Sequence, residues 1–392
     1  MRVLFVTHDA YLYGANRSLL NLIDGLRDLG VTPHVVVPRA GELAAALTKR
    51  HVPFAVLPLA MWMGRSRLAA PYRLARNLAL LPRLIRLVRQ WEIEVIYTNS
   101  SVTPLGAWAA ALARVPHVWH VREFGDRDYG LRHDWGRRCF ASWMHRSSAV
   151  IAISHAVRAD VLQGARRDVH VIWNGVADRE GLEILRNLGE TLAQQSPRAS
   201  GSYVFVSAGA LIPRKGHEEA IRGFRCVAGD YPDAKLLVMG SGSSRYVEKL
   251  KALSEALGIS EQVEFTGYLP NPFVVYLKAD AVLVCSHHEA LGRVAQEAMA
   301  CGKPVVGNLS GGLTEIVQHE ETGLLYTGGQ AELAHCMRRL LDAPSWGRAL
   351  GEAGRRRAER HFLIEDCAAR IAAVLERVAA TPPTTPASTY VR

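Results

Sequence analysis

Short apolar runs alternate with helical patterns along most of the chain, and this alternation limits the fold more than any other feature. Each run has the length of one buried strand, and the pattern after it is long enough to cross back over a sheet. Strands that alternate with helices pair in parallel, with helices on both faces. The sequence therefore predicts α/β domains with doubly wound parallel sheets. In the first half the expected strands are 2–7, 34–37, 54–57, 95–97, 117–120, 150–153 and 169–172.

The chain has 392 residues, which is enough for two domains. A polar segment at 177–202 predicts the linker between them, with a short helix at 182–192. We expect an N-terminal domain over 1–176 and a C-terminal domain over 203–360. The proline-containing tail, 381–392, is expected to be disordered.

Composition excludes several protein classes. Hydrophobic residues make up 49% and charged residues 21%, as in globular proteins. The chain contains no run of 18 apolar residues, so we expect no transmembrane helix, and the N-terminus predicts a buried strand and not a signal peptide. The six cysteines form no CxxC pair and have no histidine at metal spacing, which favours reduced thiols in a cytosolic protein without a metal site.

The net charge of +10 is compatible with nucleic acid, an anionic membrane surface or an anionic substrate as partner. Residues 61–90 hold seven arginines and no acidic residue, and within 72–90 leucines, an isoleucine and a valine recur at helical spacing. Two interpretations are equally supported: a membrane-surface helix, or a core-packing helix with a solvated basic face. Pro82 is expected to kink or break this helix. No basic patch interleaved with aromatic residues supports nucleic-acid binding.

One stretch, 283–326, combines a strand, a polar corner, a helix and a second strand. Glu289 lies on the corner and Glu297 follows eight residues later. On a helix this spacing places the second side chain about 80° around from the first. If Glu289 caps the helix, both carboxylates lie beyond the carboxyl ends of the strands, where open α/β sheets bind ligands. The alternative is a surface helix with two solvated glutamates.

The sequence after this pair strengthens the first interpretation. Ala-Met-Ala-Cys-Gly-Lys-Pro-Val-Val follows Glu297, and Gly311-Gly312 and Thr-Glu-Ile-Val come next. Together these motifs resemble the signature of the family 4 retaining glycosyltransferases of the GT-B fold (glycosyltransferase group 1). The resemblance covers nearly the whole chain and is strongest over 209–326. It implies two Rossmann-like domains facing across a cleft, with a last helix at 361–380 that crosses back to the first domain.

The resemblance also implies the donor site. In the family the first glutamate faces the donor sugar and phosphates, the second binds the nucleotide ribose, and a lysine grips the diphosphate. These roles fall on Glu289, Glu297 and Lys215. The family's usual arginine position holds Ala210, and Arg214 or Arg293 would supply the missing charge. The predicted donor contacts are Gly14, Arg214, Lys215, Gly240, Tyr268, Leu269, Glu289, Leu291, Gly292, Arg293, Val294, Glu297, Gly311, Gly312, Leu313 and Thr314.

Polar residues follow two strands of the first half, at 97–101 and 119–123. A histidine at the end of a parallel strand lies where substrates bind, and family members often carry one near the transferred sugar. We therefore predict His120 as a catalytic residue together with Glu289 and Lys215, and His8 as a weaker candidate. The predicted acceptor contacts are Asn99, Ser100, Arg122 and Glu123. Ser154 matches a family serine, but it is equally an N-cap for the helix after it.

The expected function is transfer of a sugar from a nucleotide-sugar to a glycan or lipid-linked acceptor, with retention of configuration. We expect it in cell-surface polysaccharide or lipopolysaccharide biosynthesis, at the cytoplasmic face of a membrane. The donor is a substrate, and no cofactor, metal or nucleic acid is expected. Because Ala210 replaces the usual arginine, the alternative is a nucleotide-sugar-binding protein with weakened catalysis.

Overall fold

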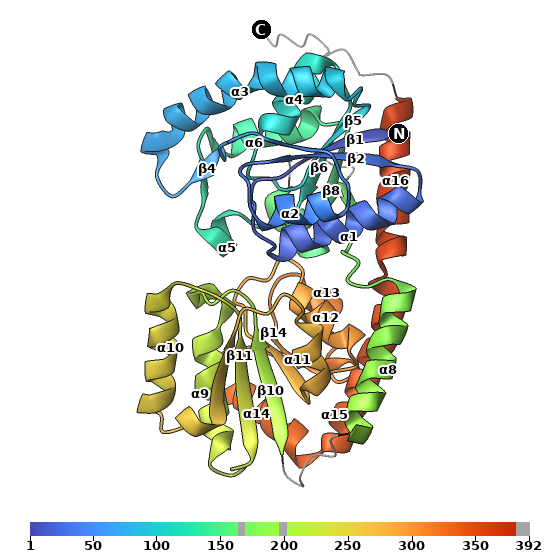
Figure 1. Ribbon diagram of the computed structural model, residues 1–392. Coiled ribbons are helices and arrows are strands. Elements are labelled where there is room, and N and C mark those ends of the chain that lie inside the picture. Colours follow the sequence, from blue (N-terminus) through green and yellow to red (C-terminus); the bar gives the residue numbers. More distant parts are fainter. Residues whose placement is uncertain (164–168, 196–201, 382–392) are drawn as a thin grey trace. The chain divides into compact units, whose positions relative to one another are not determined.

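The structure, a computed structural model, describes residues 1–163, 169–195 and 202–381. Contacts within the chain divide it into two compact units, each built on its own parallel sheet (Figure 1). The first unit comprises Met1–Gly175 and the C-terminal segment that begins at Ile364. The second comprises Val176–Leu363.

In the first sheet the strand order reverses beside β1. The chain builds outward from β1 through β2 to β3 and then adds β5, β6, β8 and β9 on the other side of β1. Ligands of open parallel sheets bind beyond the carboxyl ends of the strands at such a reversal, here between β1 and β5. The strands are β1 (Arg2–Val6), β2 (Thr32–Val37), β3 (Phe54–Val56), β5 (Val95–Thr98), β6 (His117–Val121), β8 (Ala149–Ala152) and β9 (Val169–Val171).

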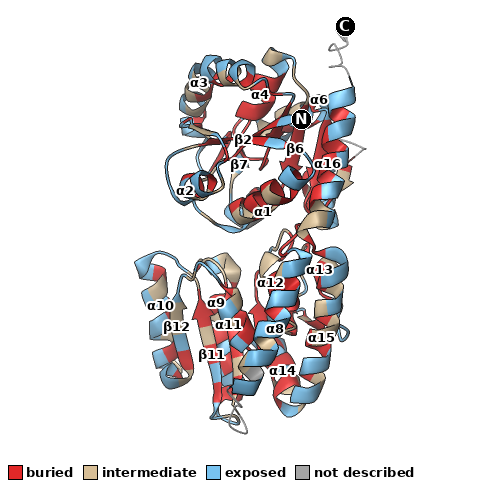
Figure 2. Ribbon diagram, turned by 45° about the vertical axis from the view of Figure 1, so that its right-hand side comes forward, coloured by how far each residue is buried: buried red, intermediate tan, exposed pale blue. Residues whose placement is uncertain are grey.

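The helices of the first unit cover both faces of this sheet, and buried residues concentrate on the strands and on the inner helix faces (Figure 2). They are α1 (Gly14–Asp28), α2 (Glu42–Lys49), α3 (Ala70–Gln90), α4 (Leu105–Ala113), α5 (Asp126–Tyr129), α6 (Gly136–Arg146), α7 (His155–Val161) and α16 (Ile364–Ala380). Leu19, Ile23 and Leu26 of α1 share one buried cluster with Ile371 and Leu375 of α16. Helix α16 therefore completes the core of the first unit, although it follows the second unit in the sequence.

The second sheet has the same topology, with the reversal between β10 and β13. Its strands, in spatial order, are β12 (Val263–Gly267), β11 (Ala234–Met239), β10 (Tyr203–Ala208), β13 (Ala281–Val284), β14 (Val305–Asn308) and β15 (Gly323–Tyr326). Its helices are α8 (Arg179–Gln195), α9 (His217–Ala228), α10 (Ser244–Ala256), α11 (Phe273–Lys278), α12 (Arg293–Ala300), α13 (Leu313–Ile316), α14 (Gly329–Asp342) and α15 (Pro344–His361). The predicted fold class, two Rossmann-like parallel sheets, is confirmed.

The sequence analysis missed two small features. A short antiparallel ribbon pairs β4 (Met63–Gly64) with β7 (Arg132–His133), and β15 adds an edge strand to the second sheet. Within the segment expected to link the domains, α8 packs against α11. The remainder of that segment, 196–201, and the tail from 382 onward lie outside the described residues.

Helix α3 corrects one expectation, because it continues through Pro82 without a break. Proline removes the backbone N–H that would bond the carbonyl of Leu78, four residues earlier. Leu78 is half exposed, so water can satisfy its carbonyl and the helix persists. The buried residues of α3 are Ala70, Asn77, Leu81, Leu84 and Val88, so Leu78 does not belong to the core face as its spacing had suggested. Among the described residues, no helix has the length and apolar character to span a bilayer.

Candidate functional site

The strand reversal of the second sheet brings Lys215 and Glu289 together. Lys215 lies in the loop after β10 and Glu289 in the loop after β13, and the two strands are neighbours. The Lys215 Nζ atom is 2.7 Å from Glu289 Oε2, and the two side chains are 21% and 13% exposed. Burial alone would raise the pKa of Glu289, but the Lys215 ammonium and the Ser286 hydroxyl hold it below its usual value. The site therefore presents a charged pair that water reaches only partly.

Glycines allow the surrounding loops to pack against the corner that carries Glu289. Gly216 has a positive φ of 71°, and a Cβ there would lie 2.1 Å from the carbonyl oxygen of Cys285. Gly311 also has a positive φ, and a Cβ there would lie 2.2 Å from the carbonyl oxygen of Glu289. The Gly312 N–H donates to that same carbonyl at 2.8 Å. The paired glycines thus fix the corner as well as lying beside it.

Glu297, on α12, is held at both carboxylate oxygens. Arg293 Nε donates to Oε1 at 2.8 Å, and the Tyr276 hydroxyl donates to Oε2 at 3.4 Å. Glu297 and Glu289 are therefore not solvated residues of a surface helix, and that alternative is wrong. Arg293 is engaged by Glu297, and which arginine substitutes for the missing one, Arg214 or Arg293, stays a prediction. Arg214 also lowers the pKa of Glu289 electrostatically.

His217 is a site residue that sequence reasoning missed. It is fully buried at the start of α9, and its Nε2 lies 3.1 Å from the Ala210 carbonyl oxygen. A carbonyl only accepts, so Nε2 carries the hydrogen and Nδ1 accepts from the Ser207 hydroxyl at 2.8 Å. Burial lowers the pKa of His217 to about 4, which keeps the ring neutral. His217 therefore ties β10 to the turn that carries Lys215, and the only signal in the sequence was its place after Lys-Gly.

The other predicted donor contacts fall into three groups. Leu291 and Leu313 are buried. Gly240 fits closely against Gly209, and Gly292 begins α12 with a positive φ. The remaining residues lie on loops and helix starts around the corner, and their side chains are at least partly exposed: Tyr268, Leu269, Val294 and Thr314. Their contact with a donor stays a prediction.

In the first unit, the predicted acceptor contacts form internal bonds at the carboxyl ends of β5 and β6. Arg122 donates to Asn99 Oδ1 at 2.6 Å and to Asn174 Oδ1 at 2.7 Å. Glu123 Oε1 accepts from the Ser100 hydroxyl at 2.9 Å and from the Ser101 N–H at 2.6 Å. These side chains are buried, and the bonds join two neighbouring strand ends. Contact with an acceptor stays a prediction for this group.

His120 lies among them, at the same end of β6. It is fully buried, its Nδ1 contacts the Tyr97 hydroxyl, and its Nε2 has no hydrogen-bond partner among the described residues. Burial and the nearby Arg122 guanidinium lower the pKa of His120 well below its ordinary value. The imidazole is therefore neutral.

The last predicted residues of this unit lie at two other strand ends. Gly14 begins α1 after the loop that follows β1, and His8 lies in that loop. The Asn16 side chain closes the loop by donating to the carbonyls of Asp9 and Tyr11. Ser154 accepts from the Val157 N–H at 3.0 Å, which confirms the N-cap interpretation.

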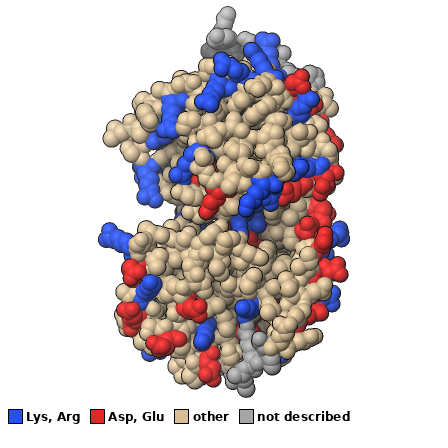
Figure 3. Space-filling view, in the orientation of Figure 1, with Lys and Arg blue, Asp and Glu red and all other residues tan. Residues whose placement is uncertain are grey.

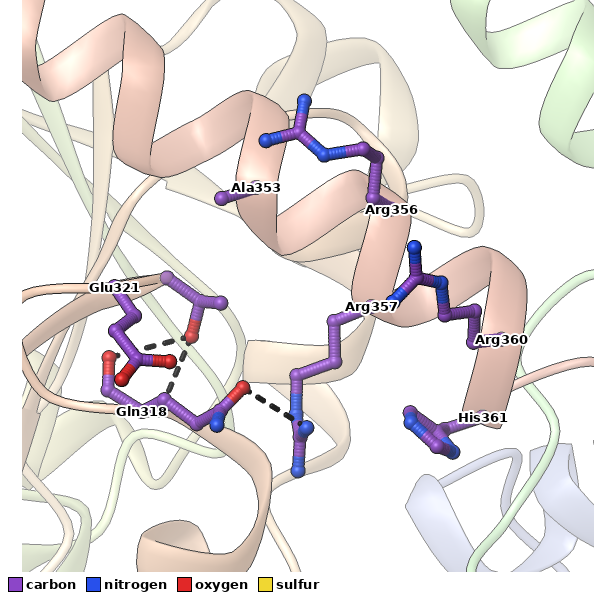
Figure 4. A pocket seen from close by; sticks show the side chains of 8 residues that line it. Gln318, Glu321, Ala353, Arg356, Arg357, Arg360 and His361 are labelled. Atoms are coloured by element: carbon purple, nitrogen blue, oxygen red, sulfur yellow. Dashed lines mark hydrogen bonds between the residues drawn. The ribbon is translucent and has the colours of Figure 1, made fainter.

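A separate cavity of about 200 Å³ lies at the end of α15 and shares no residue with this site (Figure 4). Arg357 crosses it to Gln318 and also donates to the carbonyls of Glu315 and Ile316. It thereby caps the last turn of α13, and this structural role accounts for Arg357 without invoking a ligand in the cavity. Within the described residues, no group of three histidine, cysteine, aspartate or glutamate side chains is placed to hold a metal ion.

Comparison with known proteins agrees with this geometry. Residues 13–180 match Glycosyltransferase Family 4, and residues 190–357 match Glycosyl transferases group 1. The 2-deoxystreptamine glucosyltransferase of Streptomyces kanamyceticus is 35% identical over 323 residues, which cover 76% of this chain and 81% of that protein. The lipopolysaccharide core biosynthesis glycosyltransferase LpsD of Rhizobium meliloti is 26% identical over 348 residues, covering 87% and 88%.

Solved structures lead to the same class. HepE of Anabaena, solved in complex with UDP-glucose, superposes with a TM-score of 0.80 at 25% identity, over 96% of this chain and all of that one. The chain therefore belongs to the family 4, or group 1, glycosyltransferases of the GT-B fold, as its motifs had indicated.

Proposed function

We propose that this glycosyltransferase moves a sugar from a nucleotide-sugar donor to a glycan or lipid-linked acceptor, with retention of configuration and without a metal. The proposal places this reaction in cell-surface polysaccharide or lipopolysaccharide biosynthesis. The observation that carries it is the Lys215–Glu289 pair at the strand reversal of the second sheet. A UDP-glucose complex of HepE and the role of LpsD in lipopolysaccharide core biosynthesis support the donor and acceptor classes.

In this proposal Lys215 balances the charge of the donor diphosphate. A cation held beside a leaving phosphate in a partly dry site stabilises the charge that develops as the sugar departs. Arg214 and the N-terminus of α12 add positive potential at the same place. Glu297, oriented by Arg293 and Tyr276, would accept hydrogen bonds from the ribose hydroxyls.

The test pairs calorimetry with product analysis. Uridine, guanosine and adenosine diphosphate sugars are titrated into the protein, and products formed with membrane extract are identified by mass spectrometry. We expect one donor to bind and to yield a glycosylated product with the anomeric configuration of the donor. If no nucleotide-sugar binds, the proposal fails.

Lys215→Met tests the role of the pair. Transfer should fall on the order of 100-fold, because one stabilising group at the developing charge is lost. Lys249→Met is the matched control, since Lys249 also pairs with a glutamate in this unit, but at the exposed surface. Equal activity in the two variants would contradict the assignment.

A second candidate function, a nucleotide-sugar-binding protein with weakened catalysis, is motivated by Ala210 alone. Donor hydrolysis separates the two, because binding without release of sugar favours the second candidate. Ala210→Arg should then tighten donor binding about tenfold, a gain of roughly 1.4 kcal/mol. An unchanged affinity would mean that Arg214 already supplies the charge.

We also propose peripheral contact with an anionic membrane through α3 and the segment before it. Leu68, Tyr72 and Leu78 are 94%, 66% and 50% exposed. Arg83, Arg86 and Arg89 are exposed on the same helix, and Lys and Arg side chains are visible over this part of the first unit (Figure 3). Exposed apolar side chains beside arginines match the interface of an anionic bilayer.

The membrane proposal is tested by sedimentation with vesicles of phosphatidylcholine, with and without phosphatidylglycerol. Arg83→Gln/Arg86→Gln should reduce binding to the anionic vesicles. Arg222→Gln/Arg225→Gln, an exposed pair with the same spacing on α9, should leave it unchanged. If neither variant changes sedimentation, α3 is not the contact.

A further inference from the structure

Three buried polar side chains, Arg122, Tyr97 and His120, lie at the carboxyl ends of β5 and β6. All three side chains are buried, and Tyr97 and His120 are 0% exposed. The Tyr97 hydroxyl contacts His120 Nδ1, and the positive charge of Arg122 acts electrostatically on both side chains. The other ring nitrogen, His120 Nε2, has no hydrogen-bond partner among the described residues.

The groups around Tyr97 determine which partner donates in the hydrogen bond between Tyr97 and His120. Arg122 donates to the Asn99 and Asn174 carbonyl oxygens, and because a guanidinium has only donors it offers the Tyr97 hydroxyl no acceptor. Burial raises the pKa of Tyr97, so its hydroxyl keeps its proton. Among the described residues, the acceptor that this proton reaches is the lone pair of His120 Nδ1.

The tautomer of His120 follows. Because Nδ1 accepts, the single hydrogen of the neutral imidazole is on Nε2. A buried N–H without an acceptor is unfavourable in the free protein, and a ligand oxygen at this position would relieve that cost. Since the ring is fully buried, such an oxygen reaches Nε2 only when the side chains that cover it move.

We infer that Tyr97 is a positioning residue that holds His120 in the Nε2–H tautomer, so that it donates a hydrogen bond to a hydroxyl or ring oxygen of the sugar substrate. The inference rests on the proposed function, because it assumes that a sugar binds beside His120. It also excludes one catalytic role for His120, that of a general base acting through Nε2. With its lone pair directed at Tyr97, His120 stabilises an oxygen and does not remove a proton through Nε2.

The tautomer is measured directly, without activity. Long-range proton–nitrogen correlation spectra of the protein with labelled histidine distinguish a protonated from an unprotonated ring nitrogen, and His120→Gln identifies the resonances. We expect Nδ1 unprotonated and Nε2 protonated in the wild type. In Tyr97→Phe, which keeps the ring and loses the donor, we expect the two nitrogens to shift toward a mixture of tautomers. Tyr203→Phe, at a buried tyrosine at the start of β10, should leave the His120 signals unchanged.

Activity supplies the second readout. The amide nitrogen of glutamine takes the place of histidine Nε2, whereas that of asparagine takes the place of Nδ1, so His120→Gln should retain more transfer than His120→Asn. Tyr97→Phe should lower kcat several-fold with little change in the KM of the donor. A protonated Nδ1, or more activity in His120→Asn than in His120→Gln, overturns the inference.

Addition of the nucleotide-sugar found by the calorimetric screen separates two occupants of Nε2. A shift of the Nε2–H resonance supports contact with the substrate, whereas an unchanged resonance means that a buried water takes this hydrogen bond and the inference fails. A protein without any transfer activity would end the proposed function, while the tautomer spectra would still confirm or refute the role of Tyr97.

Discussion

At the scale of single residues, the charge of Glu289 and the orientation of Glu297 depend on their bonding partners. Glu289 is charged because Lys215 stands beside it, and Glu297 is oriented because Arg293 and Tyr276 take one oxygen each. Removing one partner of a buried pair leaves the other without compensation, which costs more than the pair contributes. Stability measurements therefore reveal these pairs independently of activity.

The pH dependence of Lys215→Met is one such measurement. The native pKa of Glu289 is below its usual value of 4.5, so its contribution to stability is present above that value and is lost as the pH falls through the native pKa. We expect the variant to be less stable than the wild type by roughly 3 kcal/mol at neutral pH. The difference should shrink in acid, where Glu289 is protonated in both proteins. Urea unfolding at neutral and acidic pH measures it, and a difference independent of pH would be evidence against the ion pair.

The positions of site residues could be predicted where a sequence motif directly follows a predicted strand. Lys215 and Glu289 follow strands that the alternation pattern makes adjacent, and the structure brings them together. His217 and Tyr276 gave no such signal, because a buried histidine or tyrosine in a sequence does not reveal its hydrogen-bond partner. Arg122 and Glu123 are engaged by polar side chains at neighbouring strand ends, which the sequence did not indicate, and their contact with an acceptor stays a prediction.

At the scale of elements, α3 shows how exposure decides the cost of a proline. Apart from the edge strand β15, the strands of both sheets could be predicted from apolar runs, whereas the two-residue strands β4 and β7 have no periodicity to detect. The expected break at Pro82 did not account for the solvent position of Leu78, which is a tertiary property. A proline inside a helix still removes one backbone hydrogen bond.

Pro82→Ala should therefore stabilise the first unit, by about 1–3 kcal/mol, because alanine restores the missing N–H in a helix interior. Pro71→Ala is the matched control, since Pro71 lies in the first turn of the same helix, where that N–H has no partner in the helix. Chemical denaturation of both variants gives the comparison. An equal gain at the two positions would mean that unfolded-chain entropy, and not the helix bond, sets the effect.

The contact between α1 and α16 allows a second test at this scale. A Cβ at Gly25 would lie 2.8 Å from the Cβ of Ala368, closer than real side chains approach. Gly25→Ala should cost about 1–3 kcal/mol of stability through overpacking. Ala368→Gly in the same chain should recover part of that loss, although glycine alone costs about 1 kcal/mol in a helix. Additive effects of the two changes in a double-mutant cycle would show that the helices do not touch there.

At the scale of the whole molecule, the two units repeat one topology and divide the chemistry. The second unit carries Lys215, Glu289 and Glu297, and the first carries His120 with its supporting residues. Lys215 and Glu289 follow the two strands at the reversal of the second sheet, and His120 lies near the carboxyl end of β6, one strand from the reversal of the first; open parallel sheets bind ligands beyond these ends. The same architecture thus accounts for both sets of residues.

A chain that ends at Leu363 lacks α16 and exposes the face of α1 that α16 covers. We expect its first unit to lose cooperative unfolding while the second unit keeps its own transition in calorimetry. A chain that ends at Thr381 retains α16 and should unfold as the full chain does. A shortened chain with both transitions intact would mean that α16 is dispensable.

The position of α16 also sets an order of events during synthesis. Because synthesis starts at the N-terminus, the ribosome makes the second unit, Val176–Leu363, before the last helix of the first. Until α16 is made, the apolar face of α1 that α16 covers in the folded protein lacks its packing partner.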